Sequence, residues 1–153
     1  MTIEGLSVRG AEAADLAQIL PLVHGLARHH GDEPEATLDS LACDVRWGTI
    51  FLVAFVDAQI VGYAALLPLA QIQFGKRGLD MHHMFVQPAF RGMRFGRALI
   101  DAAQDVARDA GCTYLMVGTH PDNVVAQATY LASGFADAPV GGPRFGMRIE
   151  PVT

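Results

Sequence analysis

Residues 86–100 have the sequence V-Q-P-A-F-R-G-M-R-F-G-R-A-L-I. Within this stretch the hydrophobic pattern changes from that of a strand to that of a helix. The residues that lead into it, L-D-M-H-H-M-F-V at 79–86, are typical of a strand, which Pro88 brings to an end. Beyond Arg91 the apolar residues recur on one helical face: Phe95, Leu99, Ile100, Ala103, Val106, Ala107 and Ala110. The stretch therefore predicts a strand, a turn and a long amphipathic helix that ends at Gly111.

The start of this helix carries the residue types of an anion-binding site, namely Arg91, Gly92, Arg94, Gly96 and Arg97. A helix N-terminus offers unpaired N–H groups and the positive end of its dipole, and glycines let a phosphate approach the backbone. Arginines add forked hydrogen bonding, which suits a diphosphate. The spacing matches neither the Rossmann nor the P-loop pattern. The alternative is an ordinary basic first turn on a surface helix.

The elements on either side of this unit indicate the fold class. Before it we expect a strand at 3–9, a helix at 16–27 that Pro21 kinks or splits, a helix from Leu38 capped by Thr37, and a hairpin at 50–67. After it we expect a strand at 113–117, a helix at 123–133 and a last strand at 145–149. This order predicts a single α/β domain over residues 1–153. Its mixed central sheet has an antiparallel N-terminal part, a parallel strand–helix–strand crossover, and helices on both faces.

The composition narrows the functional classes. The 153 residues are 51% hydrophobic and 18% charged, which excludes a disordered or low-complexity chain. The net charge of -5 argues against nucleic-acid binding, which needs clustered Lys and Arg. No apolar run reaches the ~18 residues of a membrane-spanning helix, so we expect a cytoplasmic protein without a membrane partner. Two cysteines make no disulfide framework, and the histidine pairs lack metal-site spacing, so no metal is expected.

A second motif lies at residues 123–135, N-V-V-A-Q-A-T-Y-L-A-S-G-F. Asn123 is suited to cap a helix, and Ala126 and Tyr130 lie four residues apart on one helical face. Gly134 ends that helix and Phe135 returns to the core. Taken alone, Tyr130 is more often a packed aromatic residue than a catalytic acid.

Together the two motifs resemble those of the GNAT superfamily, the acetyl-CoA-dependent N-acetyltransferases. That family is recognised by an Arg/Gln-x-x-Gly-x-Gly/Ala loop that enters a helix after the central strand. It also has an Asn-x-x-Ala-x-x-x-Tyr helix followed by Gly-Phe. Here the loop is R-G-M-R-F-G at 91–96, and the helix carries Asn123, Ala126 and Tyr130 before Gly134-Phe135. One residue departs from the pattern, because Arg94 stands in place of the middle glycine of the loop.

The resemblance implies where acetyl-CoA would bind and react. The central strand would splay from its parallel neighbour, and the backbone groups of Phe85 and Val86 would meet the acetyl group and the pantetheine. Tyr130 would donate a proton to the leaving thiolate. The cofactor-binding residues would further include the loop and the helix cap: Arg91, Gly92, Met93, Arg94, Phe95, Gly96, Arg97 and Asn123.

The reaction also needs a base, because an alkylamine is cationic at neutral pH. The family often places a Glu on the central strand, and here His83 stands at that position. Strand alternation predicts that His82 and His83 point to opposite faces, so that only one of them faces the cleft. A neutral imidazole is a reasonable base, with an inflection of the rate near its usual pKa of ~6.5. His83, His82 and a water relay remain the alternatives.

The expected function is acetyl transfer from acetyl-CoA to a primary amine of a small molecule, polyamine-like acceptors included, or of a peptide. The amine would attack directly in a ternary complex. Candidates for contact with the acceptor are His29, Asp32, Glu33 and Glu35, in the segment that shapes the acceptor pocket in this family. The alternative is a non-catalytic acyl-CoA-binding sensor or regulatory module of the same fold. A homodimer is compatible with either function.

Overall fold

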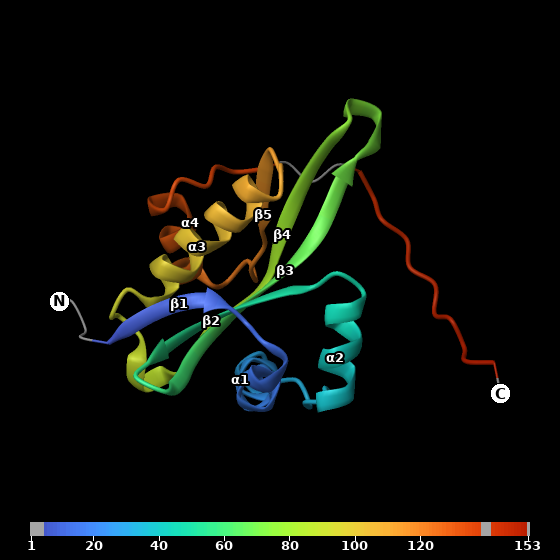
Figure 1. Ribbon diagram of the computed structural model, residues 1–153. Helices are drawn as coiled ribbons and strands as arrows, with labels where there is room; N and C mark the ends of the chain where they lie inside the picture. The colour runs from blue at the N-terminus through green and yellow to red at the C-terminus, as the bar shows by residue number, and fades with distance from the viewer. Residues whose placement is uncertain (1–4, 139–141, 153) are drawn as a thin grey trace.

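A five-stranded mixed sheet forms the centre of the computed structural model, which describes residues 5–138 and 142–152 (Figure 1). The strands lie in sequence order: β1 (Leu6–Gly10), β2 (Ile50–Val56), β3 (Gln59–Gln71), β4 (Lys76–Val86) and β5 (Tyr114–Val117). Neighbouring strands are antiparallel from β1 to β4, and β4 and β5 are parallel. The predicted fold class is confirmed, with its antiparallel N-terminal part and its single parallel crossover.

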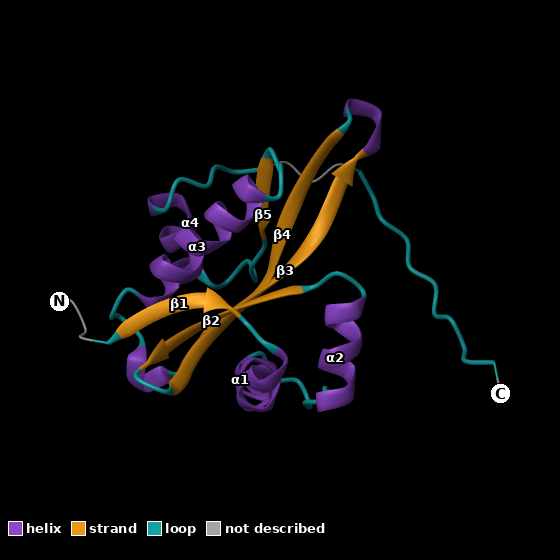
Figure 2. Cartoon of the chain, viewed as in Figure 1, coloured by secondary structure: helices purple, strands orange, loops and turns teal. Residues whose placement is uncertain are grey.

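Four helices cover the two faces of this sheet: α1 (Leu16–His29), α2 (Leu38–Arg46), α3 (Phe95–Asp109) and α4 (Val124–Ala132). Figure 2 shows α1 and α2 on one side of the strands and α3 and α4 on the other. Pro21 lies inside α1 without ending it. Thr37 caps α2 as predicted, because its hydroxyl accepts a hydrogen bond from the Ser40 N–H at 3.0 Å. Short 3₁₀ turns at Ala13–Asp15, Ile72–Phe74 and Pro88–Phe90 complete the connections.

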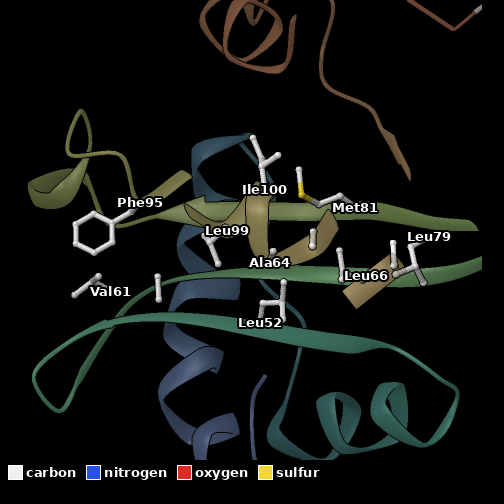
Figure 3. Packing of buried hydrophobic residues seen from close by; sticks show 12 residues of the cluster. Leu52, Val61, Ala64, Leu66, Leu79, Met81, Phe95, Leu99 and Ile100 are labelled. Atoms are coloured by element: carbon white, nitrogen blue, oxygen red, sulfur yellow. The ribbon is translucent and has the colours of Figure 1, made fainter. Parts of the chain in front are cut away.

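Strand alternation gives the sheet one hydrophobic core on each face. In β2, Leu52 packs under α3, whereas its neighbours Phe51 and Val53 pack against α1 and α2. Figure 3 shows Leu99 and Ile100 of α3 above the sheet residues. Both are fully buried, and burying a side chain of this size stabilises the fold by ~1.5–3 kcal/mol. The α3 core therefore fixes the helix whose first turn faces the candidate site.

The predicted strand at 145–149 is wrong. Residues 142–152 have no regular secondary structure, and all of them are exposed. A strand forms only where a neighbouring strand satisfies its N–H and C=O groups, and no described strand of this chain pairs with the segment. The first strand begins at Leu6, and residues 3 and 4 of that prediction lie outside the described residues. No helix of the described residues is both long and apolar enough to span a membrane.

Candidate active site

The sheet opens on the β5 side of β4. Pairing between β4 and β5 runs only from Gly78↔Tyr114 to Met81↔Val117, although β4 continues to Val86. Beyond Met81 this edge of β4 faces a cavity of about 730 Å³. At the closed end the ring of Tyr114 lies directly over Gly78, where any Cβ would clash with it. The splay that the family resemblance implies is therefore present, and it begins after the last parallel pair, Met81 with Val117.

The loop at the start of α3 forms one wall of the cavity. Among the residues that line it are Arg91, Gly92, Arg94, Phe95, Gly96 and Arg97. No side chain caps α3, and its first intrahelical backbone bond is donated by Ala98, so the N–H groups before Ala98 are free of helical partners. Such a turn, with arginines beside it, is suited to hold a diphosphate. Met93 differs from the other predicted loop residues, because it packs on the α3 core and does not line the cavity.

Arg94 adopts the left-handed conformation that its glycine counterpart would favour, with φ of 68°. A non-glycine residue pays about 1–2 kcal/mol for this conformation. Gly92 is also left-handed, with φ of 77° and no atom near its Cβ position. The backbone of this loop is therefore the one a glycine-rich sequence would adopt, and the Arg94 side chain is accommodated at its surface.

Two of the arginines have partners within the chain. The Arg91 Nε–H donates to the Val86 carbonyl at 2.9 Å, and the guanidinium lies 5.2 Å from the centroid of the Phe85 ring. This places Arg91 across the end of β4, next to both strand residues that the resemblance assigns to the cofactor. Arg97 forms an ion pair with Asp101 at 3.0 Å on the exposed face of α3.

Helix α4 forms a second wall of the cavity. The Asn123 side chain caps it by accepting from the Ala126 N–H at 3.0 Å, as predicted. Tyr130 lines the cavity and packs edge to face on Phe135, with ring centroids 5.8 Å apart. Burial raises the pKa of Tyr130, so its hydroxyl stays protonated at neutral pH. Tyr130 therefore lines the cavity in its protonated form.

The two histidines of β4 lie on the same side of the strand, and the predicted alternation is wrong here. Ala65 pairs with His83 and Leu66 with Met81, so His82 is an extra residue in a β-bulge. A bulge directs two successive side chains to similar sides of the sheet. The imidazole rings consequently stack, with centroids 4.4 Å apart and planes at 17°, and both line the cavity.

His83 has a distinct electrostatic environment. Burial, and then the neighbouring His82 and His30, lower the pKa of His83 to about 4, so its imidazole is neutral at physiological pH. Its Nδ1 lies 3.3 Å from the hydroxyl of Tyr63 on β3, which is completely buried. Burial also raises the pKa of Tyr63, which keeps that hydroxyl protonated. His82 is more exposed, and its Nδ1 lies 3.9 Å from the Asp80 carboxylate.

The structure adds residues that the sequence patterns did not indicate. His30 on the α1 side and Thr119 and His120 after β5 line the cavity, together with Leu26. Each comes from a segment without motif spacing. His29 lines the cavity as well, whereas the exposed carboxylates of Asp32, Glu33 and Glu35 do not. No cluster of three metal-ligating side chains occurs among the described residues.

Residues 16–135 match the model of the acetyltransferase (GNAT) family. The chain is 33% identical over 134 residues to an aminoglycoside N(6')-acetyltransferase type 1 of Stenotrophomonas maltophilia, covering 86% of each protein. It is 34% identical over 132 residues to an IAA acetyltransferase of Azospirillum brasilense, covering 82% of this chain and 81% of that protein.

One solved structure with the same fold is an aminoglycoside acetyltransferase from an uncultured soil metagenomic sample, in complex with sisomicin. It matches with a TM-score of 0.81 and 16% identity, over 94% of this chain and 97% of that one. The open β4–β5 edge, the loop at the start of α3 and the capped α4 helix thus occur in a chain that matches the model and the relatives of one family. The chain belongs to the GNAT family of acetyltransferases.

Proposed function

We propose that the protein transfers an acetyl group from acetyl-CoA to a primary amine of a small-molecule or peptide acceptor, by direct attack of the amine. GNAT enzymes use acetyl-CoA as the acetyl donor. The observation that carries the proposal is the cavity beside the open edge of β4. The loop before α3, Tyr130 and His83 all face it.

The cavity has the features that acetyl-CoA requires. Free N–H groups at the start of α3 and the guanidinium of Arg94 would receive the diphosphate. The unpaired edge of β4 from His82 to Val86 offers backbone groups to the amides of pantetheine, much as a further strand would. Acetyl-CoA supplies a thioester carbonyl as the electrophile and a thiolate as the leaving group.

Tyr130 would act as the general acid. Tyr130 lines the cavity from α4, and His83 lines it from β4. Because burial raises its pKa, Tyr130 holds its proton until negative charge develops on the leaving sulfur. Proton transfer to the thiolate then lets CoA leave as the free thiol.

His83 would accept the proton that the attacking nitrogen loses. Its Nδ1 faces the Tyr63 hydroxyl, which leaves Nε2 for the acceptor or for a bridging water. With a pKa near 4, His83 is in the accepting, neutral form throughout the physiological range. At neutral pH the rate is then limited by deprotonation of the amine and not of His83. The inflection that His83 causes in the pH–rate profile moves from the usual imidazole pKa to about pH 4.

The acceptor would enter beside His29 and His30, which line the cavity from the α1 side. The named activity of the relative from Stenotrophomonas maltophilia, acetylation of an aminoglycoside, supports a small-molecule amine. We include polyamine-like amines and peptide amines in the proposed class, because no residue motif distinguishes these acceptors.

Release of free thiol from acetyl-CoA in the presence of a pooled amine library tests the proposal. We expect amine-dependent thiol release that Tyr130→Phe strongly reduces. Binding of acetyl-CoA without turnover on any amine would instead support the alternative, an acyl-CoA-binding sensor. Failure of acetyl-CoA to raise the melting temperature at millimolar concentration would contradict both functions, since any ligand specific for the folded state stabilises it.

A further inference from the structure

The charge-bearing side chains that line the cavity are all basic. Among the described residues they are arginines of the loop before α3 and histidines of α1, β4 and the segment after β5. The phosphates of acetyl-CoA would neutralise the arginines, of which Arg91 already donates to the Val86 carbonyl and Arg97 already pairs with Asp101. The region that remains for the acceptor is therefore lined by imidazoles and apolar side chains.

The last turn of α1 supplies one side of this acceptor region. Leu26, His29 and His30 have the spacing i, i+3, i+4, which places them on one face of the helix, and all three line the cavity. From the other side, His82 and His83 of β4 line it with their rings stacked. Imidazoles from two separate elements thus surround the space in which the amine would react.

A positive charge is disfavoured in this region. Burial, and then His82 and His30, lower the pKa of His83, so an imidazolium is unstable there. An ammonium group of the acceptor would meet the same neighbours. The reacting amine gains from this, because only its neutral form attacks a thioester. A second ammonium group does not react, so it would keep its charge and weaken binding.

The acidic loop that follows α1 is fixed on the other face of the helix. Its three exposed carboxylates belong to Asp32, Glu33 and Glu35. The His24 Nε2–H donates to the Ala36 carbonyl at 2.7 Å and so ties this loop to α1. With 3.6 residues per turn, His24 lies opposite the face that lines the cavity. The Asp80 carboxylate, 3.9 Å from Nδ1 of His82, does not line the cavity either.

We propose, on the basis of the acetyltransferase function proposed above, that the acceptor is a monocationic amine: a primary amine on a neutral or anionic carrier, with the reacting nitrogen as its only positive charge. The imidazoles of His29 and His30 would exchange hydrogen bonds with polar groups of the carrier, and Leu26 would contact its apolar part. Polyamines would be excluded from the acceptor class.

This acceptor class differs from that of one relative. The protein of Stenotrophomonas maltophilia is named for an aminoglycoside, and aminoglycosides carry several ammonium groups. At 33% identity the two proteins share the family and its donor chemistry, and by this proposal they differ in the charge of the acceptor. The difference would be set by the side chains that α1 and β4 turn toward the cavity.

Matched pairs of acceptors test the charge preference: linear amines of one length that end in a hydroxyl or in a second amine, such as 4-aminobutan-1-ol and butane-1,4-diamine. We expect kcat/KM, measured by thiol release from acetyl-CoA at one pH, to be higher for the amino alcohol by about tenfold or more. A smaller ratio, or a preference for the diamine, would overturn this proposal and leave the acetyltransferase function intact. Absence of turnover on every amine would contradict that function, and this proposal with it.

A carboxylate placed on α1 tests the location of the effect. His30→Glu should shift the ratio of the two kcat/KM values toward the diamine by about tenfold. The matched variant His30→Gln removes the imidazole without adding a charge, and it should leave the ratio near that of the parent. Asp32→Asn, on the acidic loop, should leave the ratio unchanged as well. An unchanged ratio in His30→Glu, an equal shift in His30→Gln, or loss of diamine turnover alone in Asp32→Asn would each contradict the proposal.

Discussion

The two flanks of β4 are built differently. On one flank β3 pairs with β4 from Gln71↔Lys76 to Gly62↔Val86, and residues 60–66 of β3 are buried between the helices of the two faces. On the other flank β5 pairs only as far as Met81 and then departs, which opens the cavity. The β3 flank carries most of the buried residues, and the β5 flank opens on the cavity that we propose as the active site. We infer from this comparison that stability and reactivity are divided between the two flanks of a single strand.

If the two flanks differ in this way, the largest effect on kcat is expected from a substitution of Tyr130. Tyr130→Phe removes only the hydroxyl from the β5 flank, so kcat should fall by about 10²–10⁴-fold, the usual contribution of a general acid. The melting temperature and the affinity for acetyl-CoA should stay near those of the parent, because the ring keeps its contact with Phe135. Steady-state kinetics with a calorimetric titration of acetyl-CoA measures both. Full activity of the variant would mean that Tyr130 is only a packing residue.

On the stability side, Ile100→Ala should lower the free energy of unfolding by about 2–5 kcal/mol, because it opens a cavity in the α3 core. The matched control Val124→Ala, on the exposed surface of α4, should cost less than about 0.5 kcal/mol. Urea unfolding followed by circular dichroism measures both. Equal losses for the two variants would show that the flanks do not differ in stability as described.

A third prediction concerns the pH dependence of the reaction. The lowered pKa of His83 means that the imidazole loses its accepting form only as the pH falls through about 4. Between pH 5 and 9, kcat/KM should therefore rise with pH along the ionisation of the amine alone. Profiles for two amines of different pKa check this, since the inflection should move with the amine. An inflection near pH 6.5 that is common to both amines would contradict the lowered pKa.

Tyr63 links the two flanks, because it lies on β3 and its hydroxyl contacts His83, which lines the cavity. The Tyr63 hydroxyl contacts Nδ1 of His83. Tyr63→Phe should therefore lower kcat by about 5- to 10-fold, which corresponds to the loss of one neutral hydrogen bond of ~1 kcal/mol. The KM for acetyl-CoA should not rise. The effect should disappear in a His83→Ala background, which a double-mutant cycle measures. An equal loss in that background would assign Tyr63 a purely structural role.

The smallest effect is expected at Arg94. Arg94→Gly relieves the strain of the left-handed backbone at this position, about 1–2 kcal/mol. Glycine also has more conformational freedom in the unfolded state, which lowers the stability of the folded protein by about 0.4–1 kcal/mol. Stability should therefore rise by about 0–1.6 kcal/mol. Thermal melts detect the gain, and loss of the guanidinium should weaken acetyl-CoA binding by less than tenfold. A clear loss of stability would mean that the Arg94 side chain holds the loop through contacts of its own.

The sequence predictions were accurate where local patterns decide the structure and wrong where distant segments decide it. The long helix over 95–110 and the hairpin at 50–67 were predictable, because periodic apolar residues pack on one contiguous core. The caps Thr37 and Asn123 were predictable too, since capping is a local interaction. These features depend on residues that are close in the sequence.

The errors arose where pairing between distant segments decides the outcome. The bulge at His82 depends on the register against Ala65 and Leu66, which alternation within β4 does not contain. The strand at 145–149 has the right pattern but no pairing partner among the described strands. His30 and Thr119 reach the cavity only through the folded chain, so no motif could indicate them.

The last parallel pair between β4 and β5, Met81 with Val117, is the point from which the two strands diverge. A strand rises about 3.3 Å per residue, so the segment from Met81 to Val86 extends roughly 16 Å beyond this pair. A change of about 3.5° in the direction of that segment would shift its end by roughly 1 Å, a misplacement that can cost about 10²-fold in rate. Because any side chain at Gly78 would displace Tyr114 at the other end of the paired stretch, the pairing that carries the open edge depends on a residue far from any reacting atom.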